Sequence, residues 1–272
     1  VGSEFFSQLL LSLSSAASRV GYDLLVSAQS AGEPEMAAYR RIVGGNRVDG
    51  MILARTRKHD ERIAFLKSLN HPFAVNGRAA PDEVSDFAYI DVDSQAGIRA
   101  AVEHLTGLGH RQIGLILPPP EMAFTEFRHN GYCEGLAAAD LPYRDEFVRY
   151  GDLMQSGGYM HANALLDQHP QMTAIVACND LMALGAMSAA QARGLRVGYD
   201  LSITGFDDIP AAEYAHPPLT TIHQPMHEIG KLLVKILDSL IRGESTEQTQ
   251  ILLSSTLVIR ASTGRRKGGA DD

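Results

Sequence analysis

Polar side chains follow two predicted strands in the C-terminal third of the sequence. An apolar run at 201–204 leads through Gly-Phe into Asp207 and Asp208, and a second short strand at 220–222 leads to Gln224. Ligands of α/β proteins bind where strands end. Carboxylate and amide groups at such places are hydrogen-bond partners for hydroxyl-rich ligands. Taken by themselves, however, the two acids could equally be turn residues.

Asn179 and Arg128 are two further polar residues that could bind a ligand. Asn179 and Asp180 follow a predicted strand and begin a helix, so either could simply be an N-cap. Arg128 lies early on a predicted helix, where an arginine is usually a solvated surface residue. Its guanidinium group nevertheless offers a rigid fork of donors, which suits vicinal hydroxyls or a carboxylate.

Motifs of enzymes and cofactor sites are missing from the sequence. Dinucleotide-binding, phosphate-loop, nucleophile-elbow and zinc-protease motifs do not occur. His223 and His227 are four residues apart, but Pro225 separates them. A strand-to-helix break there would keep the two rings off a common helical face. We therefore expect no enzyme activity, no cofactor and no bound metal ion.

The charge balance argues against binding of nucleic acid by this chain. Its 272 residues carry 24 Lys and Arg against 32 Asp and Glu, a formal net charge of −8, whereas phosphate contacts need clustered basic residues. The dense basic run at 265–267 belongs to a tail at 265–272 that we expect to be disordered. Cys133 and Cys178 are expected to be unpaired thiols of a reducing cytosol. No apolar run approaches the about 20 residues of a membrane span.

Short apolar strands alternate with amphipathic helices, which predicts βαβ units and parallel sheets with both faces covered. We expect helices at residues 5–20, 34–47, 62–69, 94–108, 121–139, 156–168, 179–193 and 225–241. We expect strands at residues 24–26, 51–53, 73–75, 89–90, 113–117, 147–150, 174–177, 201–204, 220–222 and 250–258. About ten such units exceed one compact sheet, so two lobes of about 100–150 residues each are expected.

Several segments occur in an order that identifies a family. They are VDGMIL at 48–53, VEHL at 102–105 with LGHR at 108–111, NDLMALGA at 179–186, TGFDDIP at 204–210 and PPLTTIHQP at 217–225. Each alone is weak, but together they resemble the effector-binding core of the LacI/GalR bacterial transcription regulators, from Phe5 to about Ser262. The resemblance implies a type I periplasmic-binding-protein architecture. This is an α/β fold of two similar doubly wound parallel-sheet lobes, joined by three crossovers, with a ligand clamped between the lobes.

The same resemblance implies domain boundaries. The crossovers are expected near Leu108, Gln224 and Gln250. The N-terminal lobe would then comprise residues 1–108 plus 225–250, and the C-terminal lobe residues 109–224 plus 251–264. In the family, a strand inside the first lobe's sheet precedes the first helix, and here we expect that strand to be missing. Its absence would leave backbone groups of the neighbouring strands unpaired, which is costly.

The resemblance also implies ligand contacts on the second lobe. In the family, side chains at the positions of Arg128, Asn179 and Asp207 contact the ligand, with Asp207 as acceptor for hydroxyls or ring N–H groups. Gln224, at a crossover, could bind the ligand or the hinge backbone. Leu153 matches a position that is aromatic in several relatives, and a leucine offers no π-face to a purine-like ring.

Four first-lobe residues complete the expected ligand contacts. Phe5 and Phe6 fit the loop that covers a sugar face with aromatic rings, although Phe5 also fits the core face of its helix. Arg55 and Arg78 stand at strand ends that face the same cleft. They could contact the ligand or form salt bridges between the lobes.

The resemblance implies a cytoplasmic, homodimeric transcription regulator. Its small-molecule effector, a sugar or sugar derivative, would change the angle between the lobes and so alter DNA affinity by the same coupling free energy. Operator DNA would be bound only through a helix-turn-helix headpiece that these residues lack. The first helix and the loops at 211–218 are the expected dimer contacts. A periplasmic solute-binding protein that delivers a sugar to a transporter shares the fold and is the alternative.

Overall fold

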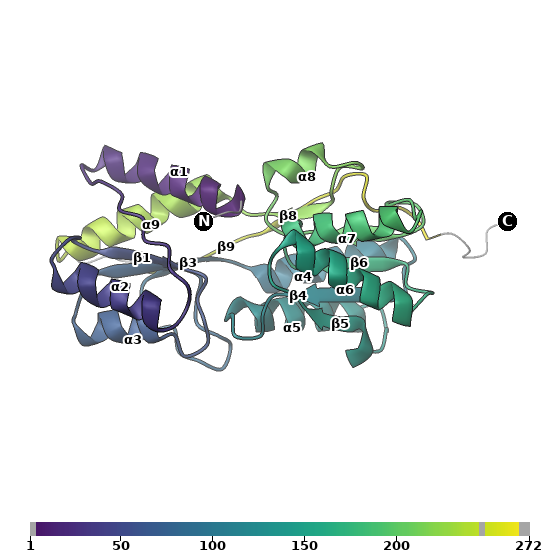
Figure 1. The fold of residues 1–272 in the computed structure, drawn as a ribbon, viewed down its shortest axis with the longest axis horizontal. Coiled ribbons are helices and arrows are strands. Elements are labelled where there is room, and N and C mark those ends of the chain that lie inside the picture. The colour runs from purple at the N-terminus through teal and green to yellow at the C-terminus, as the bar shows by residue number, and fades with distance from the viewer. Residues whose placement is uncertain (1–3, 245–247, 267–272) are drawn as a thin grey trace. The chain divides into compact units, whose positions relative to one another are not determined.

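The computed structural model describes residues 4–244 and 248–266. The chain forms two compact units, one made of Val1–Val92 and Pro225–Leu253 and the other of Asp93–Gln224 and Ser254–Asp272 (Figure 1). It therefore passes three times from one unit to the other, as expected for three crossovers. Each unit contains a parallel sheet flanked by helices, which confirms the predicted α/β class.

The sheet of the first unit has the strand order β1-β2-β3-β9. Its strands are β1 (Met51–Ala54), β2 (Phe73–Asn76), β3 (Tyr89–Val92) and β9 (Gln250–Leu253). Its helices are α1 (Glu4–Arg19), α2 (Glu33–Gly44), α3 (Glu61–Ser68) and α9 (Met226–Ile241). Although β9 lies far away in the sequence, it pairs in parallel with β3, so the C-terminal part of the chain completes the N-terminal sheet.

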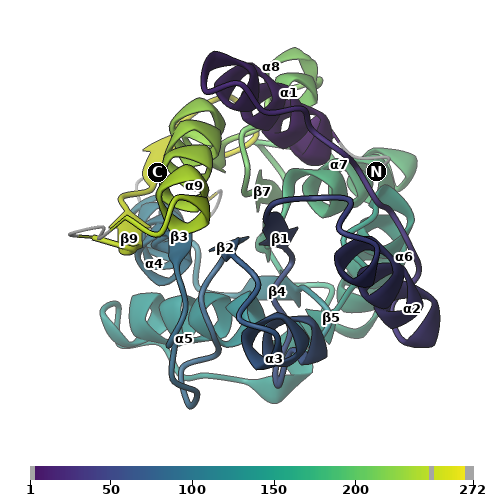
Figure 2. The ribbon, with the colours of Figure 1, turned by 90° about the vertical axis from the view of Figure 1, so that its left-hand side faces the viewer.

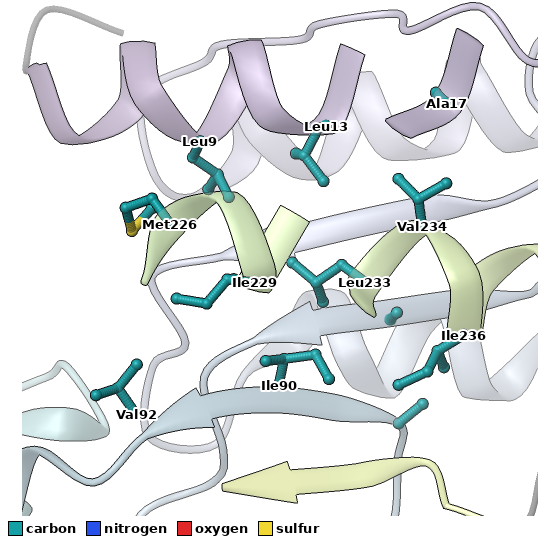
Figure 3. Close-up of a cluster of buried hydrophobic side chains, with 12 residues drawn as sticks. Leu9, Leu13, Ala17, Ile90, Val92, Met226, Ile229, Leu233, Val234 and Ile236 are labelled. Carbon is teal, nitrogen blue, oxygen red and sulfur yellow. The ribbon is translucent and has the colours of Figure 1, made fainter. Parts of the chain in front are cut away.

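Two hydrophobic cores cover the two faces of this sheet. Consecutive residues of β2 point to opposite faces, so Ala74 joins the core under α1 and α9, while Phe73 and Val75 join the core with α2 and α3. Figure 2 shows the helix pairs on either side of the strands. In Figure 3, Leu9 and Leu13 of α1 lie above the α9 side chains, which in turn cover the strands. Burying each such leucine stabilises the fold by about 1.5–3 kcal/mol.

The strand predicted at residues 24–26 does not form, and that prediction is wrong. Leu24, Leu25 and Val26 are 37%, 57% and 49% exposed, and no strand is assigned there. Among the described residues no strand lies beside the outer edge of β1, and both β1 and this segment line a cavity of about 810 Å³. An apolar run of strand length still needs a hydrogen-bonded neighbour, because an isolated strand leaves its backbone groups unpaired.

The sheet of the second unit has the strand order β5-β4-β6-β7. Its strands are β4 (Ile113–Leu117), β5 (Val148–Tyr150), β6 (Ala174–Ala177) and β7 (Ser202–Thr204). Its helices are α4 (Ser94–Gly107), α5 (Phe124–Ala137), α6 (Gln155–Gln168), α7 (Asp180–Ala192) and the short α8 (Pro210–Tyr214), with a 3-10 turn η1 (Asp145–Phe147). β8 (Thr221–His223) and β10 (Thr256–Val258) form an antiparallel ribbon.

The predicted boundary at residue 108 differs from the structure by one helix. The first unit ends at Val92, so α4 belongs to the second unit. The reason is its close packing on α5, where a Cβ on Gly131 would lie only 2.2 Å from the Gln95 carbonyl oxygen. The boundary at 224 coincides with the structure. The single extended segment predicted at 250–258 is divided into β9 and β10, which belong to different units.

The C-terminal segment is attached to the second unit as far as it is described. The His110 ring hydrogen-bonds the Gly264 carbonyl oxygen at 2.9 Å, and the Arg266 N–H donates to the Leu108 carbonyl oxygen at 2.9 Å. The first two residues of the tail predicted to be disordered, 265 and 266, are therefore ordered. Residues 267–272 of that tail lie outside the described residues. Of the helices in the described ranges, none has both the length and the apolarity to cross a membrane.

Candidate functional site

Polar side chains of the second unit form a connected cluster where its strands end. Asn179 follows β6, Asp207 follows β7, Gln224 follows β8, and Arg128 comes from α5. Contacts link them in sequence: Gln224 bonds Asp207, and Arg128 packs on the residue before Asp207 and bonds the residue before Asn179. The structure thus brings together residues that lie up to about a hundred positions apart.

The Arg128 guanidinium is buried and lies over two aromatic rings. Its Cζ lies 4.6 Å from the ring centroid of Phe124 and 4.1 Å from that of Phe206. An Nη1–H group donates to the carbonyl oxygen of Cys178. The side chain is not the solvated surface residue that its helix position alone suggested, since Arg128 is only 7% exposed. Stacking of this kind holds the plane of the guanidinium, and so the direction of its N–H groups.

Asp207 and Gln224 are directly hydrogen-bonded. Gln224 Nε2 donates to Asp207 Oδ1 at 2.7 Å, and the Asp207 N–H donates to the Ile222 carbonyl oxygen at 2.9 Å. Both Asp207 (φ 120°) and Asp208 (φ 58°) have left-handed backbone conformations. Such conformations cost about 1–3 kcal/mol each in non-glycine residues, and they persist where the surroundings enforce them.

Asp208 is held by side chains of two other segments. The Arg260 guanidinium lies 2.7 Å from its Oδ1, and the His223 ring lies 2.9 Å from its Oδ2. The two neighbouring acids therefore have separate surroundings. Asp208 ties its loop to the β8–β10 ribbon, whereas Asp207 contacts Gln224 within the cluster.

Asn179 is the N-cap of α7, as one of the two sequence interpretations had it. Its Oδ1 accepts a hydrogen bond from the Met182 N–H at 2.9 Å, and its Nδ2 donates to the Leu153 carbonyl oxygen at 3.0 Å. Leu153 is itself buried and has φ 65°. The side chain of Asn179 thus joins the loop after β5 to the start of α7, and capping does not exclude a ligand contact by the same amide.

Asp180 is a further buried acid of this cluster, to which sequence reasoning gave only a possible capping role. Its side chain is fully buried beside Thr221 and the loop that carries Asp207. Burial, followed by repulsion from Asp207, raises the pKa of Asp180 well above its ordinary range. Burial also raises the pKa of the nearby Cys178 thiol to about 12, although Arg128 opposes this shift.

The residues expected on the first unit form two separate contacts. The Arg55 Cζ lies 4.7 Å from the ring centroid of Phe6, which meets Phe5 edge-to-face at 5.5 Å. Both phenylalanines also pack against the core under α1 and α9. Arg78 Nε lies 3.1 Å from Asp91 Oδ2, an ion pair within the first unit.

Arg62 holds the backbone at Arg55 by hydrogen bonds, and the sequence analysis did not name it as a candidate residue. Its buried guanidinium donates to the carbonyl oxygens of Ala54 (3.3 Å) and Arg55 (2.9 Å) and lies 2.6 Å from Asp60 Oδ2. Burial opposes ionisation of Asp60, but hydrogen bonding and attraction from Arg62 outweigh it and lower the pKa of Asp60. The sequence feature that could have pointed to this ion pair is Asp60, a typical N-cap residue at the start of α3.

The arrangement offers hydrogen-bond donors and acceptors. Among residues 4–244 and 248–266, no group of three or more His, Cys, Asp or Glu side chains could hold a metal ion. Both cysteines are free thiols; Cys178 is buried and Cys133 is half-buried.

Comparison with known proteins gives a family match over more than half of the chain. A family model described as a periplasmic binding protein-like domain matches residues 102–263. The HTH-type transcriptional regulator CelR of Thermobifida fusca is 32% identical over 260 residues, which cover 95% of this chain and 76% of that protein.

Two solved structures are similar over nearly the whole chain. A LacI-family regulatory protein from Chloroflexus aggregans is 38% identical, with a TM-score of 0.85, covering 96% of this chain and 93% of that one. A complex of the transcriptional regulator CelR with cellobiose is 31% identical, with a TM-score of 0.90, covering 96% of this chain and 79% of that one.

Proposed function

Because this chain belongs to the LacI family of transcriptional regulators, where it forms an effector-sensing domain rather than an enzyme, we propose that its effector is a sugar or sugar derivative. The observation that carries this proposal is the hydrogen-bonding set of the second unit. Arg128 supplies N–H donors, Asp207 supplies carboxylate oxygens, and Gln224 supplies both a donor and an acceptor. Such a mixed set suits hydroxyl groups, and the similar CelR structure contains cellobiose.

Each expected contact residue has a proposed role. Arg128 donates to vicinal hydroxyls and Asp207 accepts from them, while Asn179 and Gln224 complete the polar set. Leu153 supplies an apolar contact. From the first unit, Phe5, Phe6, Arg55 and Arg78 supply aromatic cover and N–H donors, and the contact between Phe6 and Arg55 supports a joint role for these two residues.

A thermal-shift screen tests the ligand class. The panel contains mono- and disaccharides including cellobiose, polyols and nucleosides. We expect at least one saccharide to raise the melting temperature. Arg128→Ala and Asp207→Ala should each abolish that shift in protein that remains folded. A flat response to every saccharide, together with a clear shift from a nucleoside, would replace the proposed class.

We further propose that the regulator acts as a homodimer. The two expected contact surfaces carry exposed apolar side chains, Leu11 on α1 (72% exposed) and Tyr214 on α8 (73%). Large apolar groups at these places favour burial against a partner. Sedimentation equilibrium should give a dimer at micromolar concentration, and Leu11→Lys or Tyr214→Lys should shift it towards monomer. A wild-type monomer at that concentration would contradict the proposal.

We also propose that operator DNA is bound by a helix-turn-helix headpiece and not by these 272 residues. The net charge of −8 supports this, because phosphate contacts need clustered cations. A gel shift with these residues alone should show no specific complex, and tight specific binding would contradict the proposal. Since the proposed operator is bacterial chromosomal DNA, the proposed location is the cytoplasm, which cell fractionation tests.

A further inference from the structure

Asp180 lies where three segments of the second unit meet. Its backbone N–H donates to the Phe206 carbonyl oxygen at 2.8 Å. Its Oδ2 accepts from the Ile209 N–H at 2.8 Å, and its Oδ1 is 2.5 Å from Thr221 Oγ1. One fully buried residue at the start of α7 therefore contacts both ends of the loop at 205–209 and also the strand β8.

The loop at 205–209 carries the acid expected to meet the effector, and it fits tightly against Asp180. Within it Asp207 and Asp208 adopt left-handed backbone conformations. A Cβ at Gly205 would lie 2.2 Å from Asp180 Oδ1, so only glycine lets the loop approach the carboxyl group this closely. A strained loop keeps its shape only if its surroundings hold it, and Asp180 bonds the residues on either side of the strained pair.

We propose that Asp180 is a positioning residue of the effector site: the hydrogen bonds of its buried carboxyl group fix the loop at 205–209, and thereby the direction of Asp207. The inference rests on the proposed function insofar as Asp207 contacts the effector. Asp180 itself is buried and is not expected to touch the ligand.

The positioning works through hydrogen bonds rather than through charge. The charged groups that face Asp180 are the carboxyl groups of Asp207 and Asp208, so burial and these neighbours both favour its neutral form. Both carboxyl oxygens accept hydrogen bonds, Oδ1 from the Thr221 hydroxyl and Oδ2 from the Ile209 N–H. An asparagine amide can keep both contacts, because its oxygen can accept from the Ile209 N–H while its NH2 group donates to Thr221 Oγ1. Alanine leaves both partners unpaired.

Hydrogen–deuterium exchange on ligand-free protein tests the positioning without reference to any effector. In Asp180→Ala, amides at 205–209 should exchange at least tenfold faster than in wild type, while those of β4 and α5 change less than threefold. In Asp180→Asn, the loop should stay within threefold of wild type. The matched control is Ser188→Ala, which removes a hydroxyl that bonds the Leu184 carbonyl oxygen within α7; its loop exchange should not change.

Three outcomes would overturn the inference. They are unchanged loop exchange in Asp180→Ala, equally faster exchange throughout the second unit, or a loss of protection in Asp180→Asn as large as in Asp180→Ala. If Asp180→Ala does not fold, Thr221→Val removes one of the two side-chain bonds and should raise loop exchange at least threefold. No increase in that variant would also count against the inference.

Isothermal titration with cellobiose separates this inference from the proposed ligand class. If wild-type protein binds cellobiose, Asp180→Ala should weaken binding at least tenfold and Asp180→Asn less than threefold. If wild-type protein does not bind it, cellobiose is not the effector, and the exchange experiment still decides the role of Asp180.

Discussion

At the scale of single residues, the cluster of the second unit is defined by how its side chains are held. Arg128 lies over two aromatic rings, Gln224 bonds Asp207, and Asn179 caps α7. A group that is already oriented loses less freedom when a ligand arrives. The orientation of these groups is therefore as important to affinity as their chemical type.

Arg128→Lys tests the shape of the guanidinium against its charge. Lysine keeps the positive charge but loses the planar fork and much of the stacking on Phe124 and Phe206. We expect the affinity for a saccharide identified in the thermal screen to fall about tenfold or more, which corresponds to about 1.4 kcal/mol. Arg193→Lys, at an exposed pair with Asp167, is the control and should bind normally in the same calorimetric titration. Equal affinity for wild type and Arg128→Lys would show that charge alone suffices.

Asp60→Asn tests the buried ion pair with Arg62. Asparagine keeps the N-cap of α3 but removes the nearer of the two carboxylates that pair with the buried guanidinium and leaves Glu35 at 3.3 Å, which should cost about 1.5–3 kcal/mol at pH 7. Because the pKa of Asp60 is lowered in the folded protein, its contribution is present above its ordinary value of 3.8 and is lost as the pH falls below it. Urea unfolding should show a large difference between variant and wild type at pH 7 and a smaller one near pH 3. A difference independent of pH would contradict the ion-pair explanation.

At the scale of elements, the helix pair α4–α5 decides where the second unit begins. Gly131 and Gly135 on one face of α5 let its backbone approach α4 closely, since a Cβ on Gly135 would lie 2.6 Å from Val102 Cβ. This contact holds α4 on the second unit.

Gly131→Ala should disturb that contact. The added methyl group meets the backbone carbonyl of Gln95, which cannot move like a flexible side chain, so we expect a loss of about 1–3 kcal/mol in urea unfolding. Gly107→Ala is the matched control, because nothing lies within 4 Å of its Cβ position. It should be neutral or stabilise the helix by up to about 1 kcal/mol. Equal effects of the two substitutions would argue against close packing as the cause.

At the scale of the whole molecule, the first unit is stabilised by hydrophobic cores of its own. The cores on the two faces of its sheet are made of residues from that unit alone, including α9 from the C-terminal half of the sequence. Local stability should therefore respond to mutation unit by unit.

Leu13→Ala in the core under α1 and α9 tests this independence. We expect a loss of about 2–5 kcal/mol, with faster hydrogen exchange in β1, β2 and β3 and little change in β4 and β6. Gly131→Ala should show the reverse pattern. Leu69→Ala, at a half-exposed leucine, should change exchange little in either unit. Uniform acceleration across both units by Leu13→Ala would show that they unfold as one.

The helices and strands, the α/β class and the family can be inferred from the sequence alone. Apolar runs and helical spacing are local, so the strands at 113–117 and 174–177 and the first helix agree closely with the structure. A crossover near Gln224 was expected from the family resemblance, and Gln224 is the last residue of its segment in the second unit. The polar residues at strand ends could be named because each follows its own strand in sequence.

Only the tertiary structure decided which neighbours those residues meet. The run at 24–26 has strand composition but no strand beside it, and α4 joins the second unit because α5 packs on it. The buried contacts of Asp180 with Ile209 and Thr221 join residues 29 and 41 positions apart in the chain. Those of Arg62 join a helix to the end of the strand before it. Local sequence determines what a segment can form, whereas pairing, burial and the shift of a pKa depend on partners that only folding brings into contact.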